Sequence, residues 1–278
     1  MRNHFGGRSR QSLVVARGFI DAAAKGSTAD AASALSTELF FITSVLSSNI
    51  SLRRAVNDPS RDAKSKAVLL KEIFGKSVGA SALNVITGVS ELRWSASSDL
   101  VEVLEQLAIE AEASAANIAN ELDRVESELF TVARAISTSF ELRSALITAG
   151  AGKAKSDLIA DLLGKNSSSS TIKLVNHVVN NWRARSVEAA FDDYQYALAA
   201  RRNRLIAVAR TAVALSSAQY DRLVAALTQQ LGQPVRVNVE VDPSVIGGLS
   251  VKFADELVDG TLVNRIASAG RTLAGKSA

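Results

Sequence analysis

Hydrophobic residues recur three, four and seven positions apart along most of residues 1–203. This spacing is that of an amphipathic helix, which buries one apolar stripe and leaves the opposite side to water. The runs 89–149 and 165–231 contain neither glycine nor proline, and such uninterrupted runs favour helix. The pattern therefore predicts a series of helices, each with one apolar side that has to pack against its neighbours.

The helical part contains an internal duplication with a period of 90 residues, since residue 128 matches residue 38. Residues 38–55 resemble residues 128–145: both segments begin with Glu-Leu-Phe, and both carry Leu-Arg near their end. After a gap of one residue the match continues, and the valine and arginine pattern of 85–93 returns at 175–183. A repeat of this length indicates two copies of one supersecondary unit.

Each copy predicts the same order of short helices. In both copies a leucine-rich helix ends at a glycine, Gly75 or Gly164, and we expect a left-handed helix cap there. A long helix over 99–127 is expected to close the first bundle and to open the second. The domains that follow are a first helical bundle, a second, duplicated bundle and a C-terminal α/β domain, over residues 1–98, 99–203 and 204–278.

The pattern changes to a period of two in the C-terminal part. Valines at alternate positions of 235–241 are separated by polar residues, and residues 249–253 repeat this alternation, as half-buried strands do. Residues 205–213 fit either a strand or a continued helix, and the strand is favoured. Ser216 and Gln219 form a capping box that opens a further helix. We therefore expect a mainly α protein with two tandem N-terminal helical bundles and a small C-terminal α/β domain with a short mixed sheet.

Turn signals separate these strands. The proline after the strand 235–241 ends that strand, because proline has no N–H for the sheet ladder. The paired glycines before the strand 249–253 permit a positive φ. An Asp-Gly pair predicts a second tight turn. We interpret the residues of these turns as fold-setting: Asp242, Pro243, Ile246, Gly247, Gly248, Asp259 and Gly260.

The composition excludes several kinds of protein. No cysteine is present, so disulfides and thiol chemistry are excluded. The net charge of +4 comes from interspersed charges of both signs, which does not indicate nucleic-acid binding. No charge-free window is long enough to cross a bilayer, and Arg17 interrupts the apolar N-terminal stretch. We therefore expect a soluble cytoplasmic protein with neither a membrane-spanning helix nor a signal peptide.

No catalytic or metal-binding group of residues stands out. The string around Gly150 and Gly152 lacks the first glycine and the hydroxyl residue of a phosphate-binding loop, and its place in the repeat predicts a loop between helices. His177 has no partner at metal-ligand spacing, so a packed helix residue is favoured. We expect no catalytic residue, no metal and no cofactor. Four carboxylates are expected on the solvated side of the 99–127 helix: Glu102, Glu105, Glu110 and Glu112.

The C-terminal part resembles the delta subunit of F-type ATP synthases, the family that includes the oligomycin-sensitivity-conferring protein. The helical part is similar to the N-terminal bundle of that family at Leu52-Arg53 and at Glu91-Leu92-Arg93. The family commonly has one such bundle, so this chain resembles the longer actinobacterial forms, and no membrane anchor is expected. The resemblance is specific over about 205–273 and rests on Val241-Asp242-Pro243, Ile246-Gly247-Gly248 and Asp259-Gly260-Thr261.

The resemblance implies a peripheral-stalk subunit, or stator, without chemistry of its own. In the family the bundle binds N-terminal helices of the alpha subunits and the C-terminal region meets the b-subunit stalk, so that the catalytic head does not turn with the rotor. It implies a peripheral place on the cytoplasmic face of the plasma membrane, with no nucleic acid and no small-molecule substrate. For the first bundle, helix spacing suggests Phe19, Ile86 and Val89 as contacts with the alpha subunit.

Two other classes of function stay open at this point. One is a helical adaptor with two peptide-binding grooves and no connection to ATP synthase. The other, an enzyme within the C-terminal domain, is disfavoured because no titratable cluster is present. The sequence also leaves open which of the two bundles meets the catalytic head.

Overall fold

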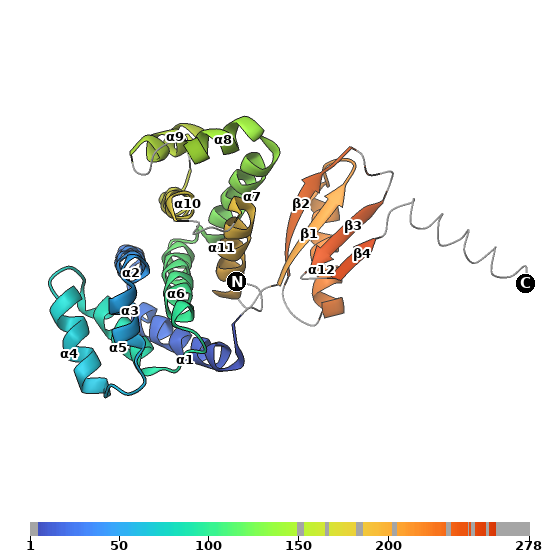
Figure 1. Cartoon of the computed structure of the whole chain (residues 1–278). Coiled ribbons are helices and arrows are strands. Elements are labelled where there is room, and N and C mark those ends of the chain that lie inside the picture. Colours follow the sequence, from blue (N-terminus) through green and yellow to red (C-terminus); the bar gives the residue numbers. More distant parts are fainter. Residues whose placement is uncertain are drawn as a thin grey trace, which may run out of the picture. The chain divides into compact units, whose positions relative to one another are not determined.

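The chain forms two compact units, Met1–Leu198 and Ala199–Ala278. Figure 1 shows the computed structural model, in which helices make up the first unit and a sheet with one helix makes up the second. The structure describes residues 5–148, 153–164, 167–181, 186–201, 205–231, 235–243, 245, 248–253 and 256–259.

The order of helices repeats, as the sequence predicted. Five helices from α2 onward have counterparts in α7 to α11, and the same pairs pack together in both sets: α2 with α3 and α5, α7 with α8 and α10. The helices are α1 (Gly7–Ala24), α2 (Ala29–Ser48), α3 (Ile50–Asn57), α4 (Ala63–Phe74), α5 (Ala80–Glu91), α6 (Ser97–Ile118), α7 (Leu122–Thr138), α8 (Phe140–Thr148), α9 (Lys153–Leu163), α10 (Ser169–Asn180) and α11 (Val187–Arg201).

Helix α6 belongs to both copies. It follows α5 as the last helix of the first copy, and it also packs on α10 as α1 packs on α5. Residues 97–114 of α6 lie 90 positions after residues 7–24 of α1, so α6 has the place of α1 in the second copy. Both copies contribute to one hydrophobic core, and the division into bundles at residue 98 stays a prediction.

The long helix predicted over 99–127 is two helices, so the prediction of one continuous helix was wrong. Helix α6 ends at Ile118 and α7 begins at Leu122. Asn120 between them has φ 57°, and the N–H of Glu121 donates to the carbonyl of Ala116 at 2.8 Å. This bond and the left-handed asparagine form a C-terminal helix cap, which asparagine tolerates better than most residues.

The two repeated glycines differ. Gly164 has φ +67° and ends α9 in the predicted left-handed conformation. Gly75 has φ −61° and ψ −17°, so the left-handed cap predicted for the first copy was wrong. There the chain keeps a helical turn, and the N–H of Gly75 still donates to the carbonyl of Lys71.

Helix α2 is long and apolar enough to cross a membrane by length and composition alone. Its apolar window is 44% buried within the protein, and Leu39, Ile42 and Leu46 are fully buried in the core. Asn49 caps the start of α3, so the apolar stretch is divided between two helices. These contacts are those of a core helix.

The second unit contains a four-stranded mixed sheet, which confirms the predicted fold class. Its order is β2-β1-β3-β4, with β1 parallel to β2 and antiparallel to β3, and β3 antiparallel to β4. The favoured strand at 205–213 is confirmed as β1. The elements are β1 (Leu205–Thr211), α12 (Ser217–Leu231), β2 (Val235–Val241), β3 (Leu249–Phe253) and β4 (Glu256–Asp259).

Helix α12 packs on β2, and a small core lies between the helix and the sheet. The predicted capping box is present, since Ser216 N–H donates to Gln219 Oε1 at 2.9 Å and Gln219 N–H donates back to Ser216 Oγ at 3.4 Å. Tyr220 on this helix donates to the carbonyl of Val237 at 3.1 Å. The buried core residues come from alternate strand positions and one helix position: Ala207, Ala209, Val235, Val237, Val251 and Leu227.

The turn residues of the second unit lie partly within the described residues. Strand β2 ends at Val241 before Pro243, and Asp242 N–H donates to the carbonyl of Thr211 at 2.8 Å. Gly248 has the predicted positive φ, +78°. Asp259 is the last residue of β4, opposite Ser250. Ile246, Gly247 and Gly260 lie outside the described residues.

Candidate protein interface

The three suggested contact residues lie where α1 meets α5. Ile86 and Val89 of α5 are fully buried in the core. Phe19 of α1 is half-buried, and its ring lies against Gly88, where an added Cβ would come within 2.7 Å of it. Phe19 therefore packs α1 on α5, Ile86 and Val89 belong to the core, and a role in partner binding stays a prediction for all three.

The solvent side of this pair of helices is apolar and open. Val15 is 51% exposed, and Gly18 and Ala22 follow on the same side of α1. On α5 the neighbouring positions are the exposed Ala80 and the half-buried Leu83 and Thr87. We define the outer α1/α5 face as Val15, Gly18, Ala22, Ala80, Leu83 and Thr87.

The matching face of the second copy, between α6 and α10, is covered by helix α2. Phe40 of α2 stacks on His177 of α10, with ring centroids 3.7 Å apart. Lys173 of α10 donates to the carbonyl of Ser33 of α2 at 2.9 Å. Subtracting 90 places Lys173 on Leu83 and His177 on Thr87, so α2 occupies the surface that corresponds to the outer α1/α5 face.

The buried carboxylate of Glu112 binds α2 and α10 to each other through hydrogen bonds. Glu112 of α6 accepts from Lys173 Nζ at 2.9 Å, from Ser170 Oγ at 2.6 Å and from Ser33 Oγ at 3.1 Å. Glu112 is 1% exposed, whereas its counterpart in α1 is the exposed Ala22. Polar contacts thus close the face in the second copy, whereas the first copy has Ala22, Ala80 and Leu83 in place of Glu112, Ser170 and Lys173.

The expectation of a solvated acidic side on α6 was wrong. Glu105, Glu110 and Glu112 are each 1% exposed, and Glu102 is half-buried. Because α6 serves both copies, other helices cover it on every side. Each buried carboxylate has partners on those helices, as burial of a charge requires: Arg17 Nε lies 2.9 Å from Glu110 Oε1, and Tyr194 Oη donates to Glu105 at 3.2 Å.

A sequence signal could have identified these buried acids. Residues 97–118 contain five acidic residues but neither lysine nor arginine. A solvated helix commonly carries both signs, because opposite charges four residues apart stabilise it. Acidic residues without basic neighbours on their own helix therefore indicate partners elsewhere in the fold.

The glutamate that opens each repeated segment lies beside the N-terminus of a neighbouring helix, α5 for Glu38 and α10 for Glu128. Glu128 accepts from Thr171 Oγ1 at 2.6 Å and from the N–H of Ser168, which caps α10, at 3.0 Å. Burial raises the pKa of Glu128, but the hydrogen bonds from Thr171, Ser168 and Arg124 outweigh it, so the pKa lies below its usual value. Glu38 lies beside Gly79, the residue before α5. The two glutamates thus have the same place in the repeat, and within the described residues only Glu128 forms hydrogen bonds there.

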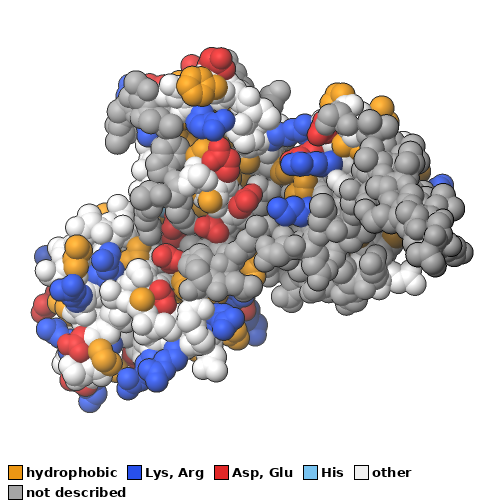
Figure 2. Space-filling model, turned by 45° about the vertical axis from the view of Figure 1, so that its right-hand side comes forward, with side chains coloured by type: hydrophobic (Ala, Val, Ile, Leu, Met, Phe, Trp, Pro, Cys, Tyr) orange, Lys and Arg blue, Asp and Glu red, His pale blue; other side chains and the backbone are white. Residues whose placement is uncertain are grey.

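The other chemical candidates have structural roles. His177 is a packed helix residue, as predicted, and its Nδ1 lies 2.5 Å from Tyr194 Oη. Within the described residues no group of histidine, aspartate and glutamate could hold a metal ion. The glycine-lysine string falls between α8 and α9, with Gly150 and Gly152 outside the described residues. On the side of the molecule shown in Figure 2, charges of both signs are interspersed.

Comparison with known proteins shows the family. The model of the "ATP synthase delta (OSCP) subunit" family matches residues 109–273, which cover most of the second copy and of the C-terminal unit. The chain belongs to the ATP synthase delta (OSCP) family. The resemblance seen in the turn residues and helix junctions is thereby confirmed.

Relatives extend the match over both copies. The chain is 41% identical to the ATP synthase subunit delta of Streptomyces coelicolor, over 96% of this chain and 98% of that protein. It is 39% identical to that of Thermobifida fusca, over 87% and 90%, and 39% identical to that of Nocardia farcinica, over 96% and 98%. The match to these actinobacterial delta subunits therefore extends over nearly the full length of both chains in two of the three cases.

Proposed function

We propose that this chain is a non-catalytic peripheral-stalk subunit of a proton-translocating ATP synthase, which ties the catalytic head to the b-subunit stalk and resists rotor torque. Family membership supports the complex, since the relatives are named subunit delta of ATP synthase. One structural observation supports this role. Of two equivalent helix faces, the α6/α10 face is covered by helix α2 of the same chain, and the outer α1/α5 face is open and apolar. The adaptor alternative is not favoured.

The proposed partner of the outer α1/α5 face is an amphipathic N-terminal helix of an alpha subunit. Helix α2 shows what this kind of surface accepts, since it lies as a helix across α6 and α10 and places Phe40 on His177. A helix lying in the space between two others buries its apolar side without needing matched charges. Val15, Ala22 and Leu83 offer apolar contacts of this sort.

The closed face of the second copy gives that copy a different role. The network of Glu112, Lys173 and Ser33 joins α6, α10 and α2, so both copies form one packed body. A stator has to transmit force without yielding, and close packing of helices across the copies suits that task. We therefore assign alpha-subunit binding to the first copy and the role of a stiff extension to the second.

The C-terminal unit is the proposed contact for the b-subunit stalk. This assignment follows the family resemblance of the turns around Pro243 and Gly248. The chain would then lie on the cytoplasmic face of the plasma membrane through its complex. We propose no catalysis by the chain itself, as its family resemblance implies.

A titration tests the interface. The full-length chain is titrated with a peptide of the alpha-subunit N-terminus, and Val15→Asp is expected to weaken binding roughly tenfold or more, because a charge would be buried against the peptide. Phe140→Asp is the matched control, since Phe140 is 74% exposed on α8 of the second copy. If Phe140→Asp weakens binding and Val15→Asp does not, the assignment to the first copy is wrong.

A coupling measurement tests the stator role. Membranes depleted of this chain are expected to hydrolyse ATP without pumping protons, and added full-length chain should restore pumping. Val15→Asp chain should restore it less well than the Phe140→Asp control. Pumping that survives complete removal of the chain would overturn the proposed function.

A further inference from the structure

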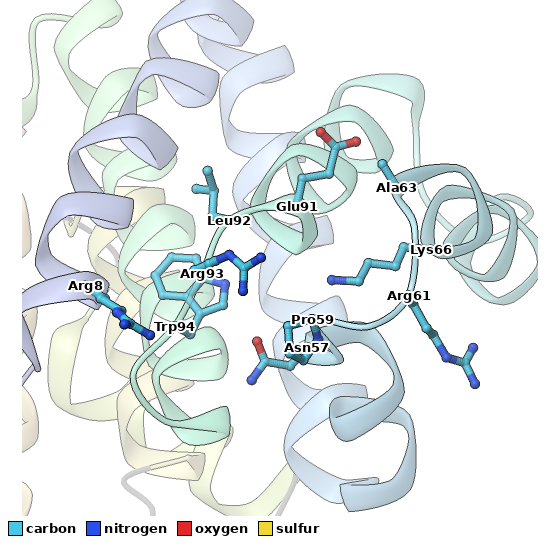
Figure 3. A pocket seen from close by; sticks show the side chains of 10 residues that line it. All are labelled: Arg8, Asn57, Pro59, Arg61, Ala63, Lys66, Glu91, Leu92, Arg93 and Trp94. Atoms are coloured by element: carbon cyan, nitrogen blue, oxygen red, sulfur yellow. The ribbon is translucent and has the colours of Figure 1, made fainter.

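The first bundle contains a basic cavity away from the outer α1/α5 face. Its volume is about 320 Å³, near the lower end of small-molecule sites. The lining comes from the start of α1, the end of α3 and its connection to α4, α4, and the end of α5 with the segment after it (Figure 3). The residues are Arg8, Asn57, Pro59, Arg61, Ala63, Lys66, Glu91, Leu92, Arg93 and Trp94. No residue of the outer face is among them.

Positive charge dominates the cavity. Four lining side chains are cationic and one, Glu91, is anionic. In Figure 3, Lys66 and Arg93 point toward each other across the cavity, whereas Glu91 points away from it. Lys66 is 5% exposed, so one of these charges is held almost out of water. Like charges brought together in this way favour an anion between them.

The donors of these cations are largely unused. Lys66 Nζ donates to the carbonyl of Ser90 at 2.8 Å, which leaves two of its three N–H groups. Within the described residues the side chains of Arg8 and Arg93 form no ion pair and no hydrogen bond. Burial and the nearby Arg93 lower the pKa of Lys66, and Asp58 and Glu91 act in the opposite direction.

Comparison with the second copy shows which residues of this cavity recur in the repeat and which do not. Lys66 and Arg93 recur as Lys155 and Arg183, and Lys66 holds the last turn of α5 through Ser90. Arg8 and Trp94 do not recur, because Ser98 and Ala184 stand at the matching positions. Trp94 has a structural contact of its own, since its Nε1 donates to the carbonyl of Val89 at 3.2 Å. The repeated fold does not require Arg8, which lines the cavity with Lys66 and Arg93 and has no matching residue in the second copy.

We infer that this cavity binds a phosphate group, held by Arg8, Lys66 and Arg93. Guanidinium groups match phosphate oxygens with paired N–H donors, and a lysine adds a compact charge. The group can be carried by free phosphate, by pyrophosphate or by a nucleotide. Binding there would bridge the start of α1, α4 and the segment after α5.

Tryptophan fluorescence of the full-length chain tests the site. The chain has two tryptophans, so Trp182→Phe leaves Trp94, inside the cavity, as the reporter. At constant ionic strength, pyrophosphate is expected to change the Trp94 emission saturably. Arg8→Gln and Arg93→Gln should each weaken binding roughly tenfold, as loss of one charged hydrogen bond does. Lys66 is left unchanged because it also stabilises α5.

Controls distinguish the site from general charge attraction. Arg54→Gln removes one exposed cation of the same bundle outside the cavity, and binding should stay within about twofold. Tighter binding of ATP than of pyrophosphate would indicate a nucleotide, and equal affinity would indicate the phosphate group alone. Absence of saturation, equal binding of glutamate, or equal loss in Arg54→Gln would overturn the inference.

Discussion

Two copies of the same helical unit differ most at one surface. The outer side of α1 and the matching side of α6 have the same positions in the repeat, yet Val14 is 68% exposed and its counterpart Leu104 is 0% exposed. Val15 and Glu105 show the same contrast, 51% against 1%. The difference lies in the neighbours: α1 packs on α5 and α6, whereas α6 packs on α2 as well as on α10 and α11.

The comparison shows how a duplication can remove a binding surface. When a second copy is fused so that its first helix is also the last helix of the first copy, one of the two equivalent faces becomes internal. The internal face then acquires polar contacts that hold it closed, such as Glu112 with Lys173. The external face has apolar side chains such as Val15, Ala22 and Leu83, and it is the face that we propose for a partner.

The largest expected effect contrasts Leu104 and Val14. Leu104→Ala should lower the free energy of unfolding by about 3 kcal/mol, because it leaves a cavity in the core. Val14→Ala should change it by less than about 0.5 kcal/mol, since that side chain is mostly in water. Urea denaturation measures both. Similar losses in the two variants would mean that the outer side of α1 is covered as well.

The next effect concerns the polar closure of the second copy. Glu112→Ala removes the carboxylate that accepts from Lys173 and from two serine hydroxyls, and we expect a loss of about 2 kcal/mol in the free energy of unfolding. Ala22→Ser, at the matching position of α1, is the comparison and should be nearly neutral. A neutral Glu112→Ala would show that the closure does not depend on this carboxylate.

A smaller effect compares Glu128 with Glu38 and depends on pH. The pKa of Glu128 is lower in the folded chain than its usual value of 4.5, so its contribution to stability is present above that value and is lost as the pH falls through the folded pKa. Glu128→Gln should cost about 1 kcal/mol at neutral pH. It should also flatten the decline of stability below pH 4.5.

Glu38→Gln supplies the comparison in the first copy. Glu38 forms no hydrogen bond within the described residues, so the variant should cost less than about 0.5 kcal/mol. Urea denaturation at several pH values measures both variants. Equal acid sensitivity of wild type and Glu128→Gln would show that another group sets the decline.

The smallest effect is a gain in stability at Gly18. Its counterpart in α6 is the buried Ala108, and a Cβ at Gly18 would meet nothing within 4 Å. Gly18→Ala should therefore raise the free energy of unfolding by roughly 0.5–1 kcal/mol through helix propensity. Gly164→Ala, at φ +67°, should lower it by about 1 kcal/mol. Thermal unfolding of the two variants resolves these opposite signs.

Local patterns in the sequence determined much of the fold. The change from helical to alternating spacing near residue 205, the capping box at Ser216 and Gln219, and the order of the repeated helices were all predicted correctly. Each depends on residues a few positions apart, whose spacing decides which backbone conformation buries apolar groups and satisfies hydrogen bonds. The family resemblance likewise rested on short turn motifs.

The use of each helix side was decided only by the tertiary structure. The sequence of α6 predicted a solvated acidic side, which was wrong because α6 serves two copies at once. The break at Asn120, a local helix cap, was also missed. Which face stays open is also set by α2, which is far from α10 in sequence but lies against it in space. Whether a side chain is buried depends on the elements packed against it. A duplicated sequence does not show which helices of the two copies will pack against a helix that both copies share.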